Sequence, residues 1–122
     1  MNVLLRGSIE RHVDRILEGG MPLDKALLMF RKGLAPTVKN VEDALFGYVI
    51  GRTIQFSFDA MQVHHKREPN GAEFSEIAEI LVRRAMEIKS KIKLIANRYY
   101  ARALVGKVFQ LFQNTSFKQQ RN

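Results

Sequence analysis

The first third of the chain has apolar residues at helical spacing. Between residues 8 and 18 they recur every three or four positions, as on one face of an α-helix. Ser8 is a suitable N-cap for this helix, and Gly19-Gly20 is a typical helix end. A second short helix is predicted to run from Pro22, a proline suited to the first turn, to Gly33.

Residues 38–67 contain no proline and are predicted to form one long helix with Thr37 as its cap. Residues 52–58 alternate between polar and apolar side chains, which is a strand pattern. Taken as a helix, the segment is apolar on two sides, which is typical of a central, buried helix. The alternation is short and has no obvious partner strand. We therefore favour the helix, with Gly51 as the place for a kink, and the strand alternative stays open.

The clearest pattern lies between residues 72 and 112. Asn70 and Glu73 have the spacing of a capping box, which predicts a helix start. The seam weakens at Arg102 and Gly106, which predicts a bend or break there. Before that point, apolar residues alternate at spacings of four and three over nearly four heptads. They are Phe74, Ala78, Leu81, Ala85, Ile88, Ile92, Ile95 and Tyr99.

These segments predict an all-α fold, an irregular bundle of two short and two long helices. Residues 1–113 form one domain in this interpretation, and residues 114–122 form a polar, frayed tail. An unbroken last helix would span about 60 Å, more than a domain of this size can cover, so a bend or packing on a second copy is needed. We therefore expect a homodimer, held through apolar faces away from the charged edge. The predicted core includes Ile16, Leu27, Phe30, Leu45, Ile50, Phe58, Leu81, Ile88, Ile92 and Ile95.

Composition narrows the class of protein. The chain has 122 residues, of which 46% are hydrophobic, which suits one globular domain. It has no cysteine, which excludes disulfides, thiolate catalysis and zinc–thiolate sites. The first twenty residues are too charged for a signal peptide. The most apolar run, residues 44–61, contains Arg52 and Asp59, so we expect no membrane span and a cytoplasmic location.

Positive charge is concentrated in the last helix. The net charge is +8, and residues 72–122 hold ten Lys and Arg against four Asp and Glu. In the heptad register, Arg84, Lys91 and Arg98 occupy successive g positions beside the apolar seam. Pairing of two copies along this seam would bring cations together, so the seam is expected to pack on the protein's own helices. The cations would then line the edge of the bundle and face an anionic partner.

The charge pattern makes nucleic acid the leading partner. A basic stripe neutralises phosphates, and Tyr99 or Tyr100 could stack on an exposed base. The first alternative is a solvated rim that only keeps the protein soluble. The second is a protein–protein adaptor that binds an acidic helical partner in a groove beside the seam. The predicted contact residues are Arg83, Arg84, Lys89, Lys91, Lys93, Arg98, Tyr100, Arg102 and Lys107.

Other candidate chemistry is weak. Gly47 and Gly51 are one turn apart, a spacing that predicts close helix packing in the core and leaves self-association as the alternative. The adjacent His64 and His65 point about 100° apart on a helix and cannot share one metal from one face. Asp59 has no second carboxylate or nucleophile at a useful spacing. We therefore expect no enzymatic activity, metal or cofactor.

Overall fold

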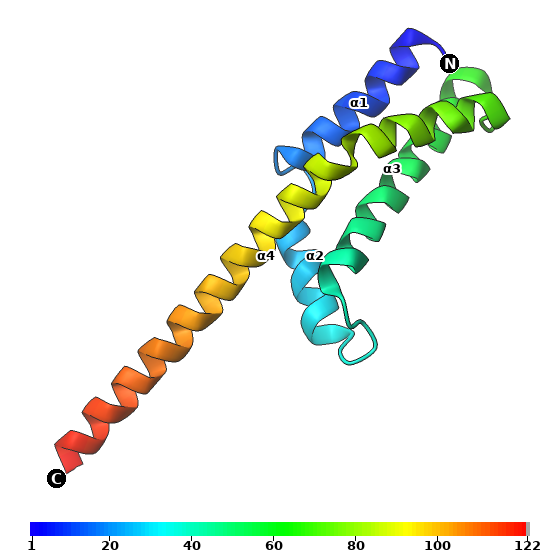
Figure 1. Ribbon diagram of the computed structural model, residues 1–122. Helices are drawn as coiled ribbons and strands as arrows, with labels where there is room; N and C mark the ends of the chain where they lie inside the picture. Colours follow the sequence, from blue (N-terminus) through cyan, green and yellow to red (C-terminus); the bar gives the residue numbers. More distant parts are fainter. Residues whose placement is uncertain (122) are drawn as a thin grey trace.

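The computed structural model describes residues 1–121, and the side chains of residues 1–114. Within that range the chain forms four α-helices and one π-helical turn, with no strand (Figure 1). The predicted all-α bundle of two short and two long helices is confirmed, and residues 52–58 are helical, so the strand alternative is wrong. The elements are α1 (Val3–Leu17), α2 (Leu23–Leu28), η1 (Met29–Gly33), α3 (Val41–His65) and α4 (Gly71–Arg121).

Helix α1 starts earlier than its apolar pattern predicts. The side chain of Asn2 accepts hydrogen bonds from the backbone N–H groups of Leu4 and Leu5, at 2.7 and 3.2 Å. Asn2 is therefore the N-cap, and Ser8 lies inside the helix. The helix ends as predicted, because Gly19 adopts a positive φ of 96° that side chains rarely tolerate.

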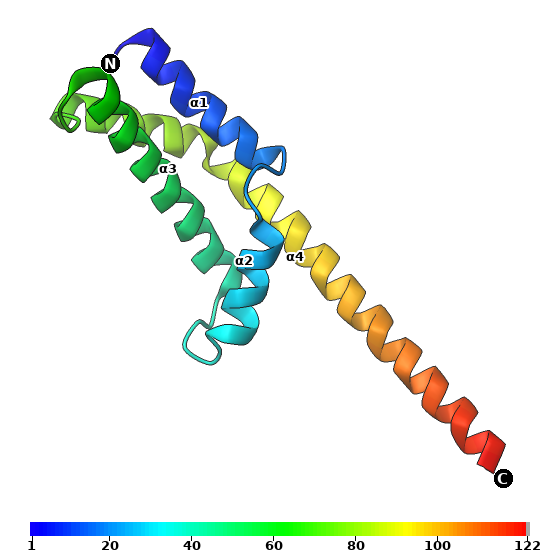
Figure 2. The ribbon, with the colours of Figure 1, turned by 180° about the vertical axis from the view of Figure 1, so that it is seen from behind.

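Helix α3 begins later than predicted, because Asn40 rather than Thr37 caps it. The Asn40 side chain accepts a hydrogen bond from the backbone N–H of Asp43 at 3.0 Å. From there the helix continues through Gly51 without interruption and packs against α1, α2 and α4 along one edge of the bundle (Figure 2). The line that it buries contains two polar residues whose hydroxyls donate to carbonyls of the preceding turn. This buried line is Leu45, Val49, Thr53, Ser57 and Met61.

The two glycines of α3 do not contact another helix of this chain. Gly47 and Gly51 are exposed, and a Cβ atom added at either would meet no other atom within 4 Å. The prediction that they allow a close approach of another helix in the core is therefore wrong. Both glycines lie on the solvent-facing side of α3.

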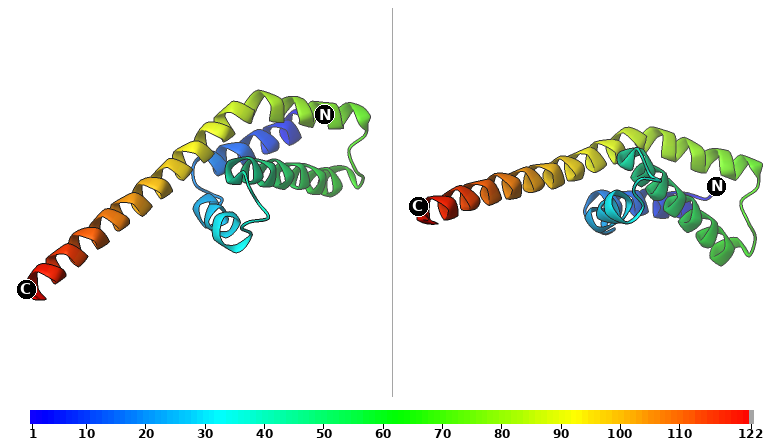
Figure 3. Two further views of the ribbon diagram at one scale, coloured as in Figure 1. Left: turned by 60° about the horizontal axis from the view of Figure 1, so that its bottom comes forward. Right: turned by 90° about the horizontal axis from the view of Figure 1, so that it is seen from below.

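Helix α4 lies against α1, α2 and α3 over its first half, on the concave side of a gentle curve (Figure 3). The predicted seam is correct in the second half of this contact, where Ile88 and Ile92 are buried. In the first half of this contact, the buried residues of α4 differ from those of the predicted seam. Phe74 and Ala78 face solvent there, and the buried residues are Ile77, Ile80 and Leu81.

The second half of α4 leaves the bundle as a free helix. The assigned helix is continuous through Arg102 and Gly106, so the predicted bend or break is absent (Figure 1). Every residue from 101 to 114 is exposed. The predicted fraying of residues 114–122 concerns side chains that, from residue 115 onward, lie outside the described residues.

The core lies where α4 crosses the other three helices. Its larger cluster joins residues of α1, α2, α3 and α4, and a smaller cluster joins Ile9 of α1 to the start of α4. Six of the predicted core residues are buried, and Phe30, Ile50, Phe58 and Ile95 are half-buried around them. The six are Ile16, Leu27, Leu45, Leu81, Ile88 and Ile92.

Among the described residues, none of the helices combines the length and the apolarity that crossing a membrane requires.

Candidate anion-binding site

The nine predicted contact residues are separated by the fold into distinct surroundings. All of them lie on α4, but the helices packed against α4 divide its circumference. One group faces α1, a second faces α3, a third faces α2, Tyr100 lies beside η1, and Lys107 lies on the free part of the helix. The prediction of a single stripe is therefore too simple.

Arg84 is bound inside the protein. Its guanidinium contacts Glu10 at 2.8 Å and Asp14 at 2.6 Å on α1, and Glu87 at 3.1 Å on α4. Only 12% of the side chain is exposed. Desolvation alone would lower the pKa of Arg84, but the hydrogen bonds to these three carboxylates outweigh it and raise that pKa. Arg84 therefore holds α1 on α4, and its donors are already used.

Arg83 is also paired, although it is more exposed. It donates a short hydrogen bond to the same Glu10 carboxylate, and 55% of its side chain remains accessible. The sequence-based expectation gave Arg83 and Arg84 the same role as the cations further along the helix. Their acid partners on α1 lie seventy or more residues away in the chain, so the helical register of α4 could not reveal them.

Lys89 and Lys93 face the start of α3. The Lys89 ammonium lies 5.1 Å from the centre of the Phe46 ring, a cation–π contact. Both lysines line a shallow depression of about 170 Å³ that also includes Glu42 and Asp43. Because two carboxylates share this depression, its field is close to balanced, and it is a poor place for an anion.

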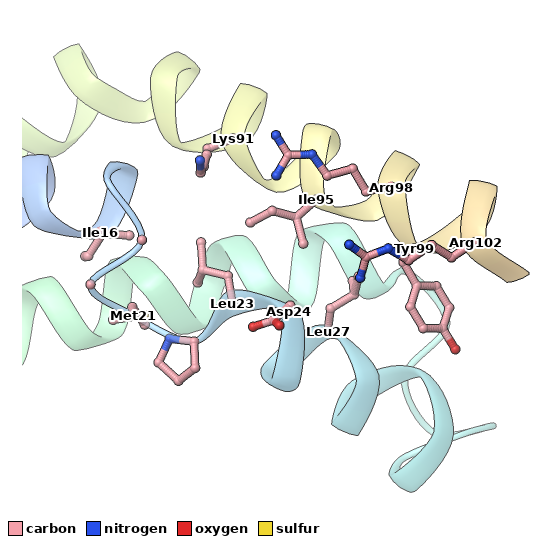
Figure 4. A pocket seen from close by; sticks show the side chains of 13 residues that line it. Ile16, Met21, Leu23, Asp24, Leu27, Lys91, Ile95, Arg98, Tyr99 and Arg102 are labelled. Carbon is pink, nitrogen blue, oxygen red and sulfur yellow. The ribbon is translucent and has the colours of Figure 1, made fainter.

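Lys91, Arg98 and Arg102 lie on the side of α4 that faces α2, around one pocket of about 470 Å³ (Figure 4). Within residues 1–114, none of these three cations forms an ion pair. The pocket has one carboxylate, Asp24, at its α2 side. In the part of the chain that the structure describes, this cavity has three unpaired cations of α4 against one carboxylate, whereas Lys89 and Lys93 share theirs with two carboxylates.

The pocket has a second chemical character beneath its charged rim. Its walls come from α1, the loop that joins α1 to α2, α2 itself and α4. The loop includes Gly20, where a Cβ atom would lie 2.8 Å from the carbonyl oxygen of Arg15, so only glycine fits this tight turn. An anion with an attached apolar or aromatic part fits such a site. The apolar lining residues are Ile16, Met21, Pro22, Leu23, Leu27 and Ile95, with the ring of Tyr99 beside them.

The two tyrosines share Arg31 as a neighbour but differ in what else surrounds them. Tyr99 lines the pocket and is half-buried, whereas Tyr100 faces the η1 turn. There the guanidinium carbon of Arg31 lies 4.3 Å from the centre of the Tyr100 ring. The same guanidinium carbon lies 5.4 Å from the centre of the Tyr99 ring. Arg31 therefore covers the predicted stacking platform at Tyr100 more closely than Tyr99, and Tyr99 is the ring that lines the pocket of the unpaired cations.

His12 of α1 is the one polar side chain in the described interior without a hydrogen-bond partner. Its ring stacks on Phe56 with 4.3 Å between centroids, and its Nε2 atom is buried without a partner. Burial lowers the pKa of His12, and the charges of Arg15 and Arg52 lower it further. His12 is therefore a neutral packing residue. No three His, Asp or Glu side chains of the described residues gather closely enough to hold a metal ion.

Sequence reasoning missed three parts of this site: Asp24, the tight turn at Gly20, and Arg31 over Tyr100. The pair Gly19-Gly20 signalled a helix end, but nothing in the pattern indicated that the turn borders the cations of α4. That contact depends on how α2 folds back on α4, a tertiary relation.

No protein-family model, curated protein or solved structure matches this chain.

Proposed function

We propose that the protein binds nucleic acid through phosphate contacts at Lys91, Arg98 and Arg102. The observation that carries the proposal is that these three unpaired cations border a single pocket with one opposing carboxylate. Phosphate contacts from Lys and Arg supply most of the sequence-independent affinity for nucleic acid. The +8 net charge of the chain favours the same class of partner.

The spacing of the cations suits an extended anion. At 1.5 Å per residue, Lys91 and Arg98 are about 10 Å apart along the axis of α4, and Arg98 and Arg102 about 6 Å apart. A polyanion such as a nucleic-acid strand can contact all three at once, whereas one small anion cannot. Tyr99 adds a ring beside the cations, so a single strand with exposed bases is the favoured form.

The test is a fluorescence anisotropy titration with labelled single-stranded and duplex DNA and RNA at low salt. With three phosphates neutralised, log K should fall with log salt concentration at a slope of about −2 to −3. Reversing the three charges together, in Lys91→Glu, Arg98→Glu, Arg102→Glu, should weaken binding about a hundredfold at low salt. Arg84 is left out, because reversing its charge would leave Glu10 and Asp14 unpaired.

The matched control reverses three exposed lysines elsewhere, in Lys25→Glu, Lys32→Glu, Lys66→Glu, and so changes the net charge equally. If the site is local, this control retains most of the affinity. Equal losses in both triple variants would mean that net charge alone drives the binding. No binding by the unaltered chain at about 50 mM salt would remove the proposal.

A second candidate uses the same pocket for a protein. The apolar floor between α2 and α4 favours an adaptor role, in which an acidic helix lays its apolar face into the pocket and its carboxylates on the cations. A pull-down with and without nuclease separates the candidates. The adaptor keeps a partner after nuclease and loses it in the Lys91, Arg98, Arg102 variant, whereas the nucleic-acid binder loses its cargo to nuclease.

A further inference from the structure

Apolar side chains also line the face of α4 that points away from the bundle. We call this the outer face. It begins beside the bundle with residues that are 77%, 71% and 46% exposed, and continues along the free half of the helix with four more residues that are 59–74% exposed. The outer face consists of Val82, Met86, Leu94, Leu104, Val105, Val108 and Phe112.

The outer face is not an extension of the protein's own core. At about 100° per residue, Val108 and Phe112 lie on the opposite side of α4 from Ile88 and Ile92, which are buried against the other helices. If α4 were simply too long for its bundle, the free half would continue the inner seam. Instead, the apolar stripe changes sides near residue 100. The apolar residues of the free half are therefore placed to pack against a surface outside this chain.

The outer face is also large for a surface patch of a soluble protein. It runs over residues 82–112, about 45 Å of helix, with the polar Ser90 and Asn97 near its middle. Exposed apolar patches, such as the two ends of this face, mark interaction sites. Figure 3 shows that α4 is straight over most of this length and that no other element of the chain lies on its convex side. A second straight helix can therefore lie along it.

Charge indicates which way such a helix points. From residue 88 to the end the chain has no acid, so the free half carries only cations, such as Lys107. Beside the bundle, the outward side of α4 carries Glu79 and Glu87, which contact Arg6 and Arg84 of their own chain and whose side chains still remain 65% and 54% exposed. A second copy aligned in parallel would place cations beside cations. An antiparallel copy would place the basic half of each α4 against the acid-bearing half of the other.

We propose that two copies of this chain pair antiparallel through their outer faces, centred near Asn97. In this register Val108 of one copy contacts Met86 of the other, and Phe112 contacts Val82. Lys107 then lies beside Glu87 of the second copy. Both ends of the outer face are covered at once, because the part of it before residue 97 and the part after residue 97 are about equally long.

This pairing does not depend on the proposed nucleic-acid site. Lys91, Arg98 and Arg102 border a pocket on the inner side, toward α2. Two copies would leave both pockets open, and the two proposals can fail separately.

Sedimentation equilibrium of the full chain tests the pairing. The unaltered protein should be a dimer at micromolar concentration. Val108→Glu in the free half and Met86→Glu beside the bundle should each raise the dimer dissociation constant roughly thirty-fold or more, since each buries an unpaired charge. Gln110→Glu, on the polar side of the same free segment, is the matched control and should leave the constant within about threefold.

Crosslinking tests the direction of pairing and benefits from a chain without cysteine. Met86→Cys and Val108→Cys, each prepared alone, should crosslink to each other on mixing and oxidation, but poorly to themselves. Asn97→Cys alone should crosslink to itself. Self-crosslinking of Val108→Cys would indicate parallel pairing and overturn the proposal. A monomer at all concentrations, or a dimer insensitive to both Val108→Glu and Met86→Glu, would overturn it as well.

Discussion

Glu73 illustrates how one residue fixes the start of a helix that is 51 residues long. Its carboxylate accepts hydrogen bonds from the Arg67 guanidinium at 2.6 and 3.2 Å and from the backbone N–H of Asn70 at 3.0 Å. In return, the side chain of Asn70 accepts a hydrogen bond from the backbone N–H of Glu73 at 2.9 Å. The predicted capping box is therefore present with both of its hydrogen bonds.

These bonds predict an acid-dependent loss of stability. The hydrogen bond from Arg67, and then that from Asn70, lower the pKa of Glu73 from its ordinary 4.5 to about 2. The charged carboxylate therefore stabilises the fold above about pH 4.5, and this contribution disappears as the pH falls toward 2. Glu73→Gln should lower the melting temperature at pH 7, and the gap from the unaltered protein should narrow below pH 4.5.

Circular dichroism melts over a pH series measure this gap. Glu68→Gln is the matched control, because the Glu68 side chain forms no ion pair among the described residues. It should produce no gap that depends on pH. A constant gap for Glu73→Gln down to pH 3 would show that the charge of Glu73 is not what stabilises the helix start.

At the scale of elements, α1 is held on α4 by charge as well as by its apolar stripe. Leu5, Ile9, Val13 and Ile16 are buried along one side of α1. The carboxylates of Glu10 and Asp14 lie one turn apart on an adjoining side of α1. Both accept hydrogen bonds from the guanidinium of Arg84. A planar group with several donors suits this arrangement better than a lysine ammonium.

Arg84→Lys should therefore destabilise the fold although it preserves the charge. A lysine cannot reach Glu10, Asp14 and Glu87 at once, and we expect a loss of about 1–2 kcal/mol in the free energy of unfolding. Arg83→Lys is the control, since an exposed pair contributes little and its loss should stay below about 0.5 kcal/mol. Urea denaturation followed by circular dichroism measures both. Equal losses would contradict a special role for Arg84.

At the scale of the whole molecule, the protein is a bundle with a projecting helix. The core ends near Tyr99, and residues 101–114 are exposed throughout. Isolated helices of this length are marginal in water, so tertiary contacts within one chain do not explain the free half of α4. The proposed pairing accounts for the projection, because the outer face of one copy would be covered by the outer face of the other.

Truncation separates the bundle from the projection. A chain ending at Ala103 should keep its core and the three cations around the pocket, because residues 104–114 are all exposed and none of them lines the pocket. We expect the melting temperature at low protein concentration to stay within a few degrees of the full chain. The truncated chain should sediment as a monomer at concentrations where the full chain is a dimer. A bundle that unfolds on truncation would contradict this division of the molecule.

The candidate site was predictable only in part. The heptad register places Lys91, Arg98 and Arg102 on one edge of α4, and the structure brings them to one pocket. The same register predicts that Arg84 also contacts the partner, but its guanidinium already donates hydrogen bonds to Glu10 and Asp14 of α1. A helical wheel describes which residues share a face. It contains no information about which distant carboxylates will lie against that face.

The sequence by itself determined the helical class, the two short and two long segments, the capping box at Asn70 and Glu73, and the glycine end of α1. Each depends on interactions within a few residues, namely hydrogen bonds to the nearest turn and the periodicity of apolar side chains. Tertiary structure alone decided the register of the first half of α4, the pairing of Arg83 and Arg84, and the length of helix left uncovered. Those features depend on contacts between residues far apart in the chain, which local patterns do not encode.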